Sequence, residues 1–423
     1  MATSLTTGCL FAWQGRSRGA LWRLPIHLII VRAGSYLDED DVKHYADIYD
    51  RAFPGRLRAP DGSDSEHRMT SQQTAKTGWD GFLDIPPYWA ETASLVAPRS
   101  YMQDRFDPEC EHVLLARREV DYGVLRFRVV DAEAALPIPM GRFRKVMPRL
   151  PRRELRVPGK VLFDFRLRAP DNWAHFLNNH LPIFFVLCDR LGLAWDETLI
   201  LLPGNTPDYI HAAAKIFGLE ILASDKVVVG RCVQFEADPW IGIRSIRAQW
   251  VRTPRVEAAV AAATQSRAPL PRRVFLSRRD TRLLSNVTEV EQFLADYDFV
   301  TVYAEDLSAA DQFRLFRDVE DIVAIHGAAL APLLYCPANS ALRQLVEILP
   351  CGHMTDVYRV MAQQVGCGWI GVRGKMKPEY VKPAYDLGAG FSAFSLDSFE
   401  VDLKTLELAF AMASHPIRES PYA

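Results

Sequence analysis

Short apolar runs alternate, from residue 160 onward, with segments whose apolar positions recur at helical spacing. This alternation predicts strands and helices in turn, and such βα units indicate a parallel sheet covered on both faces. Pro182 falls inside the first expected helix, where we expect a kink. In this part of the chain the expected strands are 161–167, 198–202 and 226–229, and the expected helices are 173–191 and 207–217.

The alternation is most regular in the second half of the chain. Ser308 stands where it can cap a helix over 309–319. The pattern predicts a second βα domain of five strands, followed by an amphipathic helix near 403–413. Its expected strands are 274–276, 299–303, 321–325, 345–348 and 369–372, with further helices from 288, over 329–335 and over 355–365.

The first 150 residues have a weaker pattern. Apolar runs predict strands at 26–31, 113–116 and 124–130, and the polar residues 54–81 predict a long loop. The proline-rich basic stretch from Arg142 to Arg153 predicts a linker or an exposed loop. We therefore expect a partly looped N-terminal extension (1–105), an N-terminal Rossmann-like domain (106–265), a C-terminal Rossmann-like domain (266–390) and a tail helix (391–423).

Composition excludes several function classes. Lys and Arg number 50 and Asp and Glu 52 in 423 residues, so the net charge of −2 gives no overall attraction to nucleic acid. Seven scattered cysteines include no CxxC pair, which argues against a zinc site or a redox dithiol. No apolar run suffices for a signal peptide or a membrane span. We expect a cytoplasmic protein; a peripheral contact with the inner membrane face or a biosynthetic enzyme stays open.

The turn after the expected strand 321–325 reads His326-Gly327-Ala328 and leads into a helix. Small residues let the backbone approach a ligand, and the unpaired N–H groups of a helix start attract anions. The segment therefore predicts a diphosphate site. A tight turn with a structural histidine is the alternative.

Three arginines, Arg278, Arg279 and Arg282, follow the expected strand 274–276. Ligands of parallel sheets bind beyond the carboxyl ends of the strands, and arginine matches phosphate oxygens in a bidentate way. These arginines are candidates for the same anion site, and a solvated loop is the alternative.

His175 and Asn179 lie four residues apart and therefore share a face of the expected helix 173–191. A histidine near a helix start can act as a general base, although a structural role is the commoner one.

Two other patterns match binding motifs in their letters but lack the surrounding structure that such motifs need. Residues 366–371 spell GxGxxG, but the order strand, turn, helix is missing, and the acidic run 38–41 is typical of a solvated helix start.

The order of these segments resembles glycosyltransferase family 61, the DUF563 group, in a bacterial-type member. The resemblance covers roughly residues 160–350. Its landmarks are Asn-x-x-His before Leu-Pro, Ser-Arg with a further Arg and Asn, an acidic-Gln pair, His-Gly-Ala, and a Val-Glu-Ile strand. They are Asn172, His175, Leu181, Pro182, Ser277, Arg278, Arg282, Asn286, Asp311, Gln312, His326, Gly327, Ala328, Val346, Glu347 and Ile348.

The resemblance implies an α/β fold of the GT-B kind, with two Rossmann-like domains facing a cleft. It implies an inverting, metal-independent transferase without a cofactor, which moves a sugar from a nucleotide sugar, a UDP-sugar in our expectation, to a glycan or polysaccharide such as a bacterial capsule. Glu347 would hold the ribose hydroxyls, and Asn172 and His180 would lie on the acceptor side. The other donor-binding residues would be Arg278, Arg282, Asn286, His326, Gly327 and Ala328.

Two positions depart from the family pattern. Relatives often have Asn-Glu where this chain has Asn286-Val287, and the other departure bears on the catalytic base. Relatives usually carry Asp or Glu four residues after the histidine of Asn-x-x-His, whereas this chain has Asn179, which cannot take a proton. The base is then His175, His180 or Asp171, and we expect His175, with Asn179 orienting the acceptor. Two other functions stay open: an inactive relative that binds a nucleotide sugar, and a GT-B-like epimerase.

Overall fold

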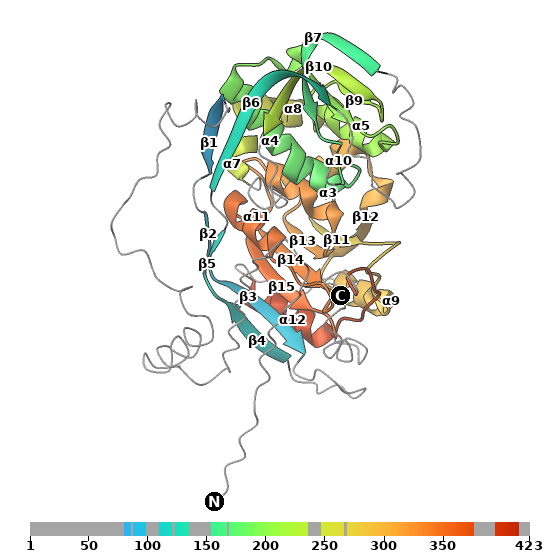
Figure 1. Cartoon of the computed structure of the whole chain (residues 1–423). Helices are drawn as coiled ribbons and strands as arrows, with labels where there is room; N and C mark the ends of the chain where they lie inside the picture. Colours follow the sequence, from blue (N-terminus) through green and yellow to red (C-terminus); the bar gives the residue numbers. More distant parts are fainter. Residues whose placement is uncertain are drawn as a thin grey trace, which may run out of the picture.

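Two sheets built largely of parallel strands organise the chain, and most of its helices lie between them (Figure 1). The computed structural model describes residues 80–85, 88–98, 110–120, 123–134, 154–166, 169–235, 247–265, 269–375 and 394–413. The expected strand at 26–31, most of the loop at 54–81 and the basic stretch at 142–153 lie outside these residues. The mixed α/β architecture agrees with the expected fold class, and the GT-B arrangement with a cleft stays a prediction.

The first sheet has the strand order β1-β6-β10-β7-β8-β9. Its last four strands are parallel, and β6 and β1 extend it in antiparallel fashion. Strand β7 begins earlier and ends earlier than its apolar run predicts. The strands are β1 Gly81–Ile85, β6 Gly123–Ala134, β7 Glu154–Asp164, β8 Thr198–Leu202, β9 Ile221–Ala223 and β10 Val227–Phe235.

The second sheet has the order β12-β11-β13-β14-β15-β3-β4. The five expected strands are confirmed and are all parallel. They are β11 Arg273–Ser277, β12 Phe299–Tyr303, β13 Asp321–Ile325, β14 Gln344–Leu349 and β15 Gly368–Arg373.

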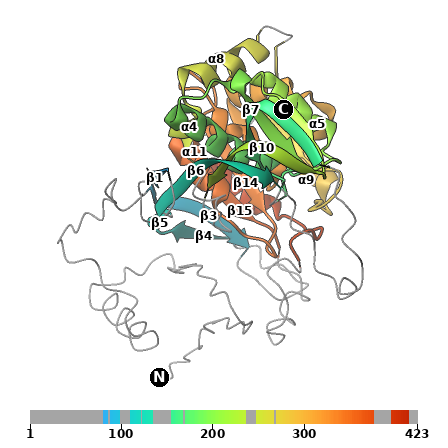
Figure 2. The same ribbon diagram turned by 45° about the horizontal axis from the view of Figure 1, so that its top comes forward.

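Two strands from the N-terminal part of the chain complete the second sheet (Figures 1 and 2). β3 (Ala93–Pro98) is parallel to β15, and β4 (Cys110–Leu115) is antiparallel to β3. The apolar run at 113–116 predicts a strand but not its partner. Residues 80–134 thus supply strands to both sheets, whereas the domain ranges above stay a prediction.

The two faces of the second sheet pack against different helices. Alternate residues of its strands enter two hydrophobic clusters, as the period of two requires: Phe275 and Val346 in one, Leu276 and Leu345 in the other. The first cluster is covered by α9 (Val287–Ala295) and α12 (Leu403–Met412). The second is continuous with the core of the first sheet. The two halves therefore share one core across the helix layer.

The helix layer carries this shared core. Rings of Phe217, Phe313 and Tyr335 lie within 5.3–5.9 Å of one another. The helices of the layer are α3 Trp173–His175, α4 Leu181–Leu191, α5 Asp208–Ile216, α7 Ala248–Val251, α8 Pro254–Ala263, α10 Ala309–Asp318 and α11 Val357–Val365. Shorter elements are the two-stranded sheet of β2 (Tyr88–Ala90) and β5 (Arg118–Val120) and the 3₁₀ turns η3 (Trp195–Glu197) and η4 (Ala304–Asp306).

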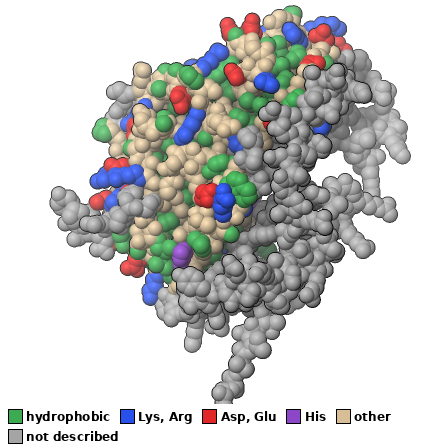
Figure 3. Space-filling view, turned by 90° about the vertical axis from the view of Figure 1, so that its left-hand side faces the viewer, with side chains coloured by type: hydrophobic (Ala, Val, Ile, Leu, Met, Phe, Trp, Pro, Cys, Tyr) green, Lys and Arg blue, Asp and Glu red, His purple; other side chains and the backbone are tan. Residues whose placement is uncertain are grey.

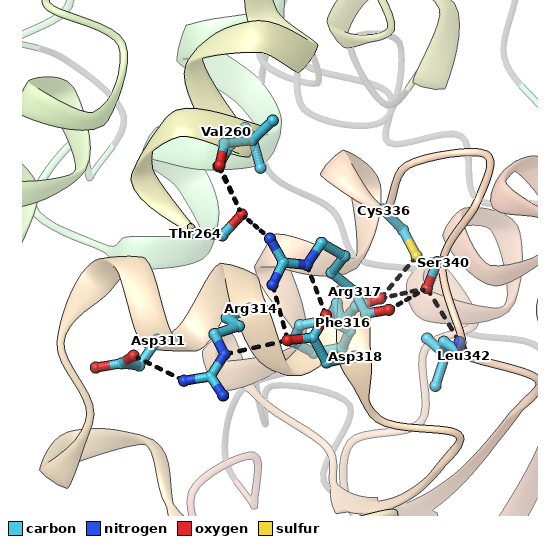
Figure 4. A network of polar contacts seen from close by, with 11 residues as sticks. Val260, Thr264, Asp311, Arg314, Phe316, Arg317, Asp318, Cys336, Ser340 and Leu342 are labelled. Atoms are coloured by element: carbon cyan, nitrogen blue, oxygen red, sulfur yellow. Dashed lines mark hydrogen bonds and ion pairs between the residues drawn. The ribbon is translucent and has the colours of Figure 1, made fainter. Parts of the chain in front are cut away.

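A polar network joins α8 to α10 within this layer (Figure 4). Arg317 Nη1 donates to Thr264 Oγ1 at 2.6 Å, and Thr264 Oγ1 donates to the Val260 carbonyl at 2.8 Å. Asp318 accepts from both Arg317 and Arg314. Because Thr264 and Arg314 are buried and the other partners are partly buried, the network fixes α8 against α10.

The helix over 173–191 is expected to kink at Pro182, and the structure shows how it does so. Between α3 and α4 the chain forms a π-helix, η2 (Phe176–His180), in which the Leu181 N–H donates to the Phe176 carbonyl. Pro182 has no N–H and its ring crowds the carbonyl four residues earlier, so the preceding turn widens. Wide turns of this kind are frequent at functional sites.

The segment expected as a helix over 329–335 is instead a 3₁₀-helix, η5 (Ala328–Tyr335), with Pro332 inside it. Proline removes one donor and disfavours a regular α-helix.

No helix within the described ranges is long and apolar enough to cross a bilayer. On the face shown in Figure 3, acidic and basic side chains are interspersed rather than gathered by sign.

Candidate functional site

Two arginines converge on the turn after β13. Strands β11 and β13 are parallel neighbours, so Arg278 and His326, which follow them, emerge at the same edge of the sheet. The Nη1 atoms of Arg278 and Arg282 donate to the His326 carbonyl at 3.4 and 3.3 Å. The buried Gly327 lies against the Arg278 guanidinium, and Ala328 begins η5. The structure therefore brings five of the expected donor-binding residues together.

These two guanidiniums bind neutral acceptors. Arg278 also donates to the Thr281 carbonyl and hydroxyl, at 2.9 and 3.1 Å. In the part of the chain that the structure describes, neither Arg278 nor Arg282 forms an ion pair with a carboxylate. Burial lowers the pKa of both, and Arg278 further lowers that of Arg282. Two half-buried positive charges that form no ion pair with a described carboxylate make this edge a candidate site for an anion.

Arg279, the third expected arginine, is already occupied. Its guanidinium donates to both carboxylate oxygens of Asp306, at 2.5 and 2.6 Å, and lies 3.9 Å from the centre of the Tyr303 ring. It is exposed and points away from the His326 turn toward β12. The three arginines thus divide into a pair that can take a ligand and one that is part of the surface.

The side chain of His326 is held by a buried carboxylate. Its Nδ1 lies 2.5 Å from Glu347 Oε1, and Trp369 Nε1 donates to Glu347 Oε2 at 2.7 Å. Glu347 is 0% exposed. We expected Glu347 to hold ribose hydroxyls. In the structure both of its carboxylate oxygens bind protein groups, and neither is exposed to a ligand. Its position suits the orientation of His326 instead.

Three aromatic residues near His326 were not expected from the sequence. The rings of His353 and Tyr358 lie 5.5 and 5.4 Å from that of His326, and Trp369 binds Glu347. Burial, with Arg282 and His326 beside it, lowers the pKa of His353 to about 4, so this ring is neutral at pH 7. Burial and Glu347 raise the pKa of Tyr358. A usable signal for His353 and Tyr358 is their place after β14, at the edge where Arg278 and His326 also lie, whereas Trp369 lies on β15 and has no such signal.

Asn286 has a different position from the one expected. Its amide Nδ2 donates to the Val401 carbonyl at 2.8 Å, and its Oδ1 accepts from the Val401 N–H at 3.2 Å. The amide therefore holds the segment that precedes α12. That segment also binds Arg282, whose Nε donates to the Ser395 carbonyl at 2.6 Å and whose N–H donates to the Leu396 carbonyl.

Arg282 has a strained backbone. Its φ of +57° lies in the left-handed region, which non-glycine residues rarely adopt. The contacts with residues 395–396 hold it there. Strain of this kind persists only where surrounding bonds over-determine it, and it is concentrated at functional sites.

The second cluster lies on the loop and helix after β7. Asn179 Nδ2 lies 2.9 Å from His175 Nδ1, which confirms that the two share a face. Asn172, expected on the acceptor side, caps α3: its Oδ1 accepts from the N–H groups of Ala174 and His175, at 2.9 and 3.2 Å. Asp171 is exposed just before this cap.

His180 does not join this cluster. It is buried, and its ring lies 4.9 Å from that of Phe165, on the side of the sheet. His175, in contrast, is exposed. Partial burial of the imidazole lowers the pKa of His175, and Asp171 opposes that shift. A neutral imidazole at pH 7 can accept a proton, so of the two histidines His175 is the one placed to act as a base.

The two clusters are carried by elements that touch. Both α3 and η2 pack against η5, the helix that begins at Ala328. Tyr335 Oη donates to the Leu177 carbonyl at 2.6 Å, and the ring of Trp173 packs edge-on against Phe313. Among the described residues no group of three or more His, Cys, Asp or Glu side chains could hold a metal ion.

Comparison with known proteins finds similarity to glycosyltransferases over the residues that carry both clusters. The family model described as Glycosyltransferase 61 matches residues 173–342, which include His175, Arg278 and His326. Over 231 residues the chain is 27% identical to the protein O-linked-mannose beta-1,4-N-acetylglucosaminyltransferase 2 of Canis lupus familiaris and to that of Bos taurus. Each match covers 48% of this chain and 39% of the relative. The resemblance to glycosyltransferase family 61 is thus confirmed over these residues, and the bacterial-type assignment stays a prediction.

Proposed function

We propose that this chain is an inverting glycosyltransferase that binds a nucleotide sugar at the turn after β13 and transfers its sugar to a hydroxyl of a glycan. The observation that carries the proposal is the pair Arg278 and Arg282, two half-buried guanidiniums that form no ion pair with any carboxylate of the described ranges. A nucleoside diphosphate supplies the missing negative charge, and Gly327 leaves room for the pair beside η5. The similarity to glycosyltransferases supports the same reaction class.

The reaction follows from what each group can do. The acceptor oxygen attacks the anomeric carbon of the sugar, and the bond between this carbon and the diphosphate oxygen breaks. His175 takes the proton of the attacking hydroxyl. Arg278 and Arg282 offset the negative charge that gathers on the leaving diphosphate. A single displacement inverts the anomeric centre, so an α-linked nucleotide sugar gives a β-linked product.

We assign supporting roles to the neighbours of these groups. Glu347, held in turn by Trp369, orients the ring of His326, whose backbone carbonyl accepts from both arginines. Asn179 orients His175, and either end of its amide can serve, because the carbonyl oxygen accepts from an Nδ1–H and the amino group donates to a bare Nδ1. The arginines make a bound metal unnecessary for charge neutralisation, so we propose a metal-independent reaction with a UDP-sugar.

Calorimetry of nucleotide binding tests the proposal. UDP and UDP-N-acetylglucosamine, the latter chosen from the name of the relatives, are titrated with EDTA present into the wild type and into Arg278→Ala, Arg282→Ala and Arg279→Ala. We expect a roughly 10- to 100-fold weaker affinity for the first two, since charge-assisted hydrogen bonds contribute about 1.5–3 kcal/mol. Arg279→Ala is the matched control. An equal loss in all three, or no nucleoside diphosphate bound by the folded wild type, contradicts the proposal.

Asn179 favours one competing function. An amide cannot take a proton, and relatives usually have a carboxylate there, so a chain that binds a nucleotide sugar without transferring it is the second candidate. Turnover separates the two. Transfer to p-nitrophenyl α-mannoside that His175→Ala abolishes supports the enzyme. Donor binding without transfer, with transfer appearing in Asn179→Asp, supports the inactive relative.

A further inference from the structure

Tyr209 is an exposed aromatic residue beside the candidate base. It lies in the first turn of α5, and 48% of its surface is exposed. Its side chain belongs to none of the hydrophobic clusters of the described residues. Packing of the core therefore does not explain a large ring at this position.

The ring of Tyr209 is nonetheless held in place. Its hydroxyl donates to the Asp171 carbonyl at 2.6 Å, and the Trp173 ring lies 6.2 Å away at an interplanar angle of 76°. The hydrogen bond fixes one end of the side chain and the edge-on contact fixes its tilt. A ring that is already ordered loses little conformational entropy when a ligand binds, which favours recognition.

Asp171 joins this ring to His175. It is four residues before the histidine, just outside the cap of α3, and its carboxylate is exposed. Burial raises the pKa of Tyr209 and the same carboxylate adds to that shift, whereas at His175 it opposes the lowering of the pKa by burial. An aromatic ring, a free carboxylate and a base thus lie together at the carboxyl edge of β7 and β8, where ligands of parallel strands bind.

We propose that Tyr209 and Asp171 form the acceptor subsite, and that its ligand is a pyranose ring. This inference rests on the proposed function and specifies its acceptor side. A pyranose has a face of C–H groups that packs on an aromatic ring, and hydroxyls that donate to a carboxylate. With its apolar face on Tyr209 and one hydroxyl bound by Asp171, a second hydroxyl is presented to His175.

Saturation-transfer NMR tests the subsite without turnover. The probes are methyl α-D-mannopyranoside, methyl β-D-glucopyranoside and methyl β-D-xylopyranoside, each added to the full chain with UDP present. We expect ring C–H signals of at least one probe in the wild type and an affinity roughly 3- to 10-fold lower in Tyr209→Ala, the range of one aromatic contact. Tyr209→Phe keeps the ring and should lose less than about 3-fold.

Trp89→Ala is the control for removal of an exposed aromatic residue. Trp89 is 43% exposed, but the Arg117 guanidinium already lies 4.4 Å from its ring centre, so it offers no free platform. Equal affinity in wild type and Tyr209→Ala, or no signal from any probe in a protein that binds UDP, overturns the subsite. Failure to bind UDP at all concerns the proposed function, and the UDP titration detects it separately.

Discussion

The Arg278 guanidinium fills the space that a side chain at residue 327 would need. A Cβ on Gly327 would lie 1.5 Å from Arg278 Nη1. The φ of Gly327 is 166°, an extended conformation open to any residue, so the backbone does not demand glycine here. A side chain at this position would instead have to displace the Arg278 guanidinium, which links the His-Gly-Ala turn to the loop after β11.

We expect Gly327→Ala to displace Arg278 and to weaken UDP binding by roughly 10-fold or more, since one charge-assisted contact contributes about 1.5–3 kcal/mol. A double-mutant cycle measured by calorimetry separates this cause from others. In the Arg278→Ala background the same substitution should change the affinity by less than about 2-fold. Additive losses would show that Gly327 acts independently of Arg278.

The pH dependence of transfer should report His175. A base works in its neutral form, so kcat/KM falls as pH drops through its pKa, and partial burial places that pKa below the ordinary 6.5. In the wild type the Asn179 amide lies 2.9 Å from His175 Nδ1, and Asn179→Asp puts a carboxylate in its place. The carboxylate favours the imidazolium and should raise the pKa by about 1–3 units.

The acid limb of kcat/KM, measured between about pH 5 and 9 where a histidine titrates, should then move to higher pH in Asn179→Asp. At low pH the kcat/KM of Asn179→Asp falls below that of the wild type, and its plateau begins at a higher pH. An acid limb that does not move, in a variant that still transfers sugar, would mean that His175 is not the titrating base.

The hydrogen bond from Trp369 to Glu347 should be visible in stability. Trp369→Phe leaves a buried carboxylate oxygen without its donor, and we expect it to lower the free energy of unfolding by about 1–3 kcal/mol beyond the loss of packing. Trp173→Phe is a matched control, because Trp173 is similarly buried and its Nε1 has no hydrogen-bond partner in the described structure. Urea unfolding measures both; equal losses would mean that the hydrogen bond contributes nothing.

Release of the segment before α12 should weaken the anion site from a distance. Asn286→Ala removes both bonds to Val401, and we expect faster hydrogen exchange over residues 394–401 together with weaker UDP binding, because the same segment holds Arg282. Exchange mass spectrometry and calorimetry measure the two effects. Weaker binding with unchanged exchange would indicate that Asn286 contacts the nucleotide itself.

Much of the second half of the molecule could be predicted from the sequence. Its five strands are short continuous apolar runs, a local property that does not depend on the rest of the chain. Because they are parallel and adjacent, residues after their carboxyl ends must meet, and Arg278, Arg282 and His326 were predictable for that reason. His175 and Asn179 followed equally from helical spacing.

Tertiary structure alone decided the remaining partners. The apolar run within β4 predicts a strand, but only long-range pairing places it, through β3, beside β15. Trp369 meets Glu347 because β14 and β15 are neighbours, which no local pattern shows. Asn286 could face a ligand or the backbone equally well, and the return of the chain at Val401 determined which.

The division has a physical reason. Spacing along one strand or helix sets which side chains share a face, and the sequence by itself determines that. Which faces then meet depends on strand order, on the π-turn forced by Pro182 and on the path of the C-terminal segment. These are set by the burial of apolar surface over the whole chain. They decided that His180 faces the core, that Glu347 holds His326, and that Arg278 and Arg282 form no ion pair with a carboxylate of the described residues.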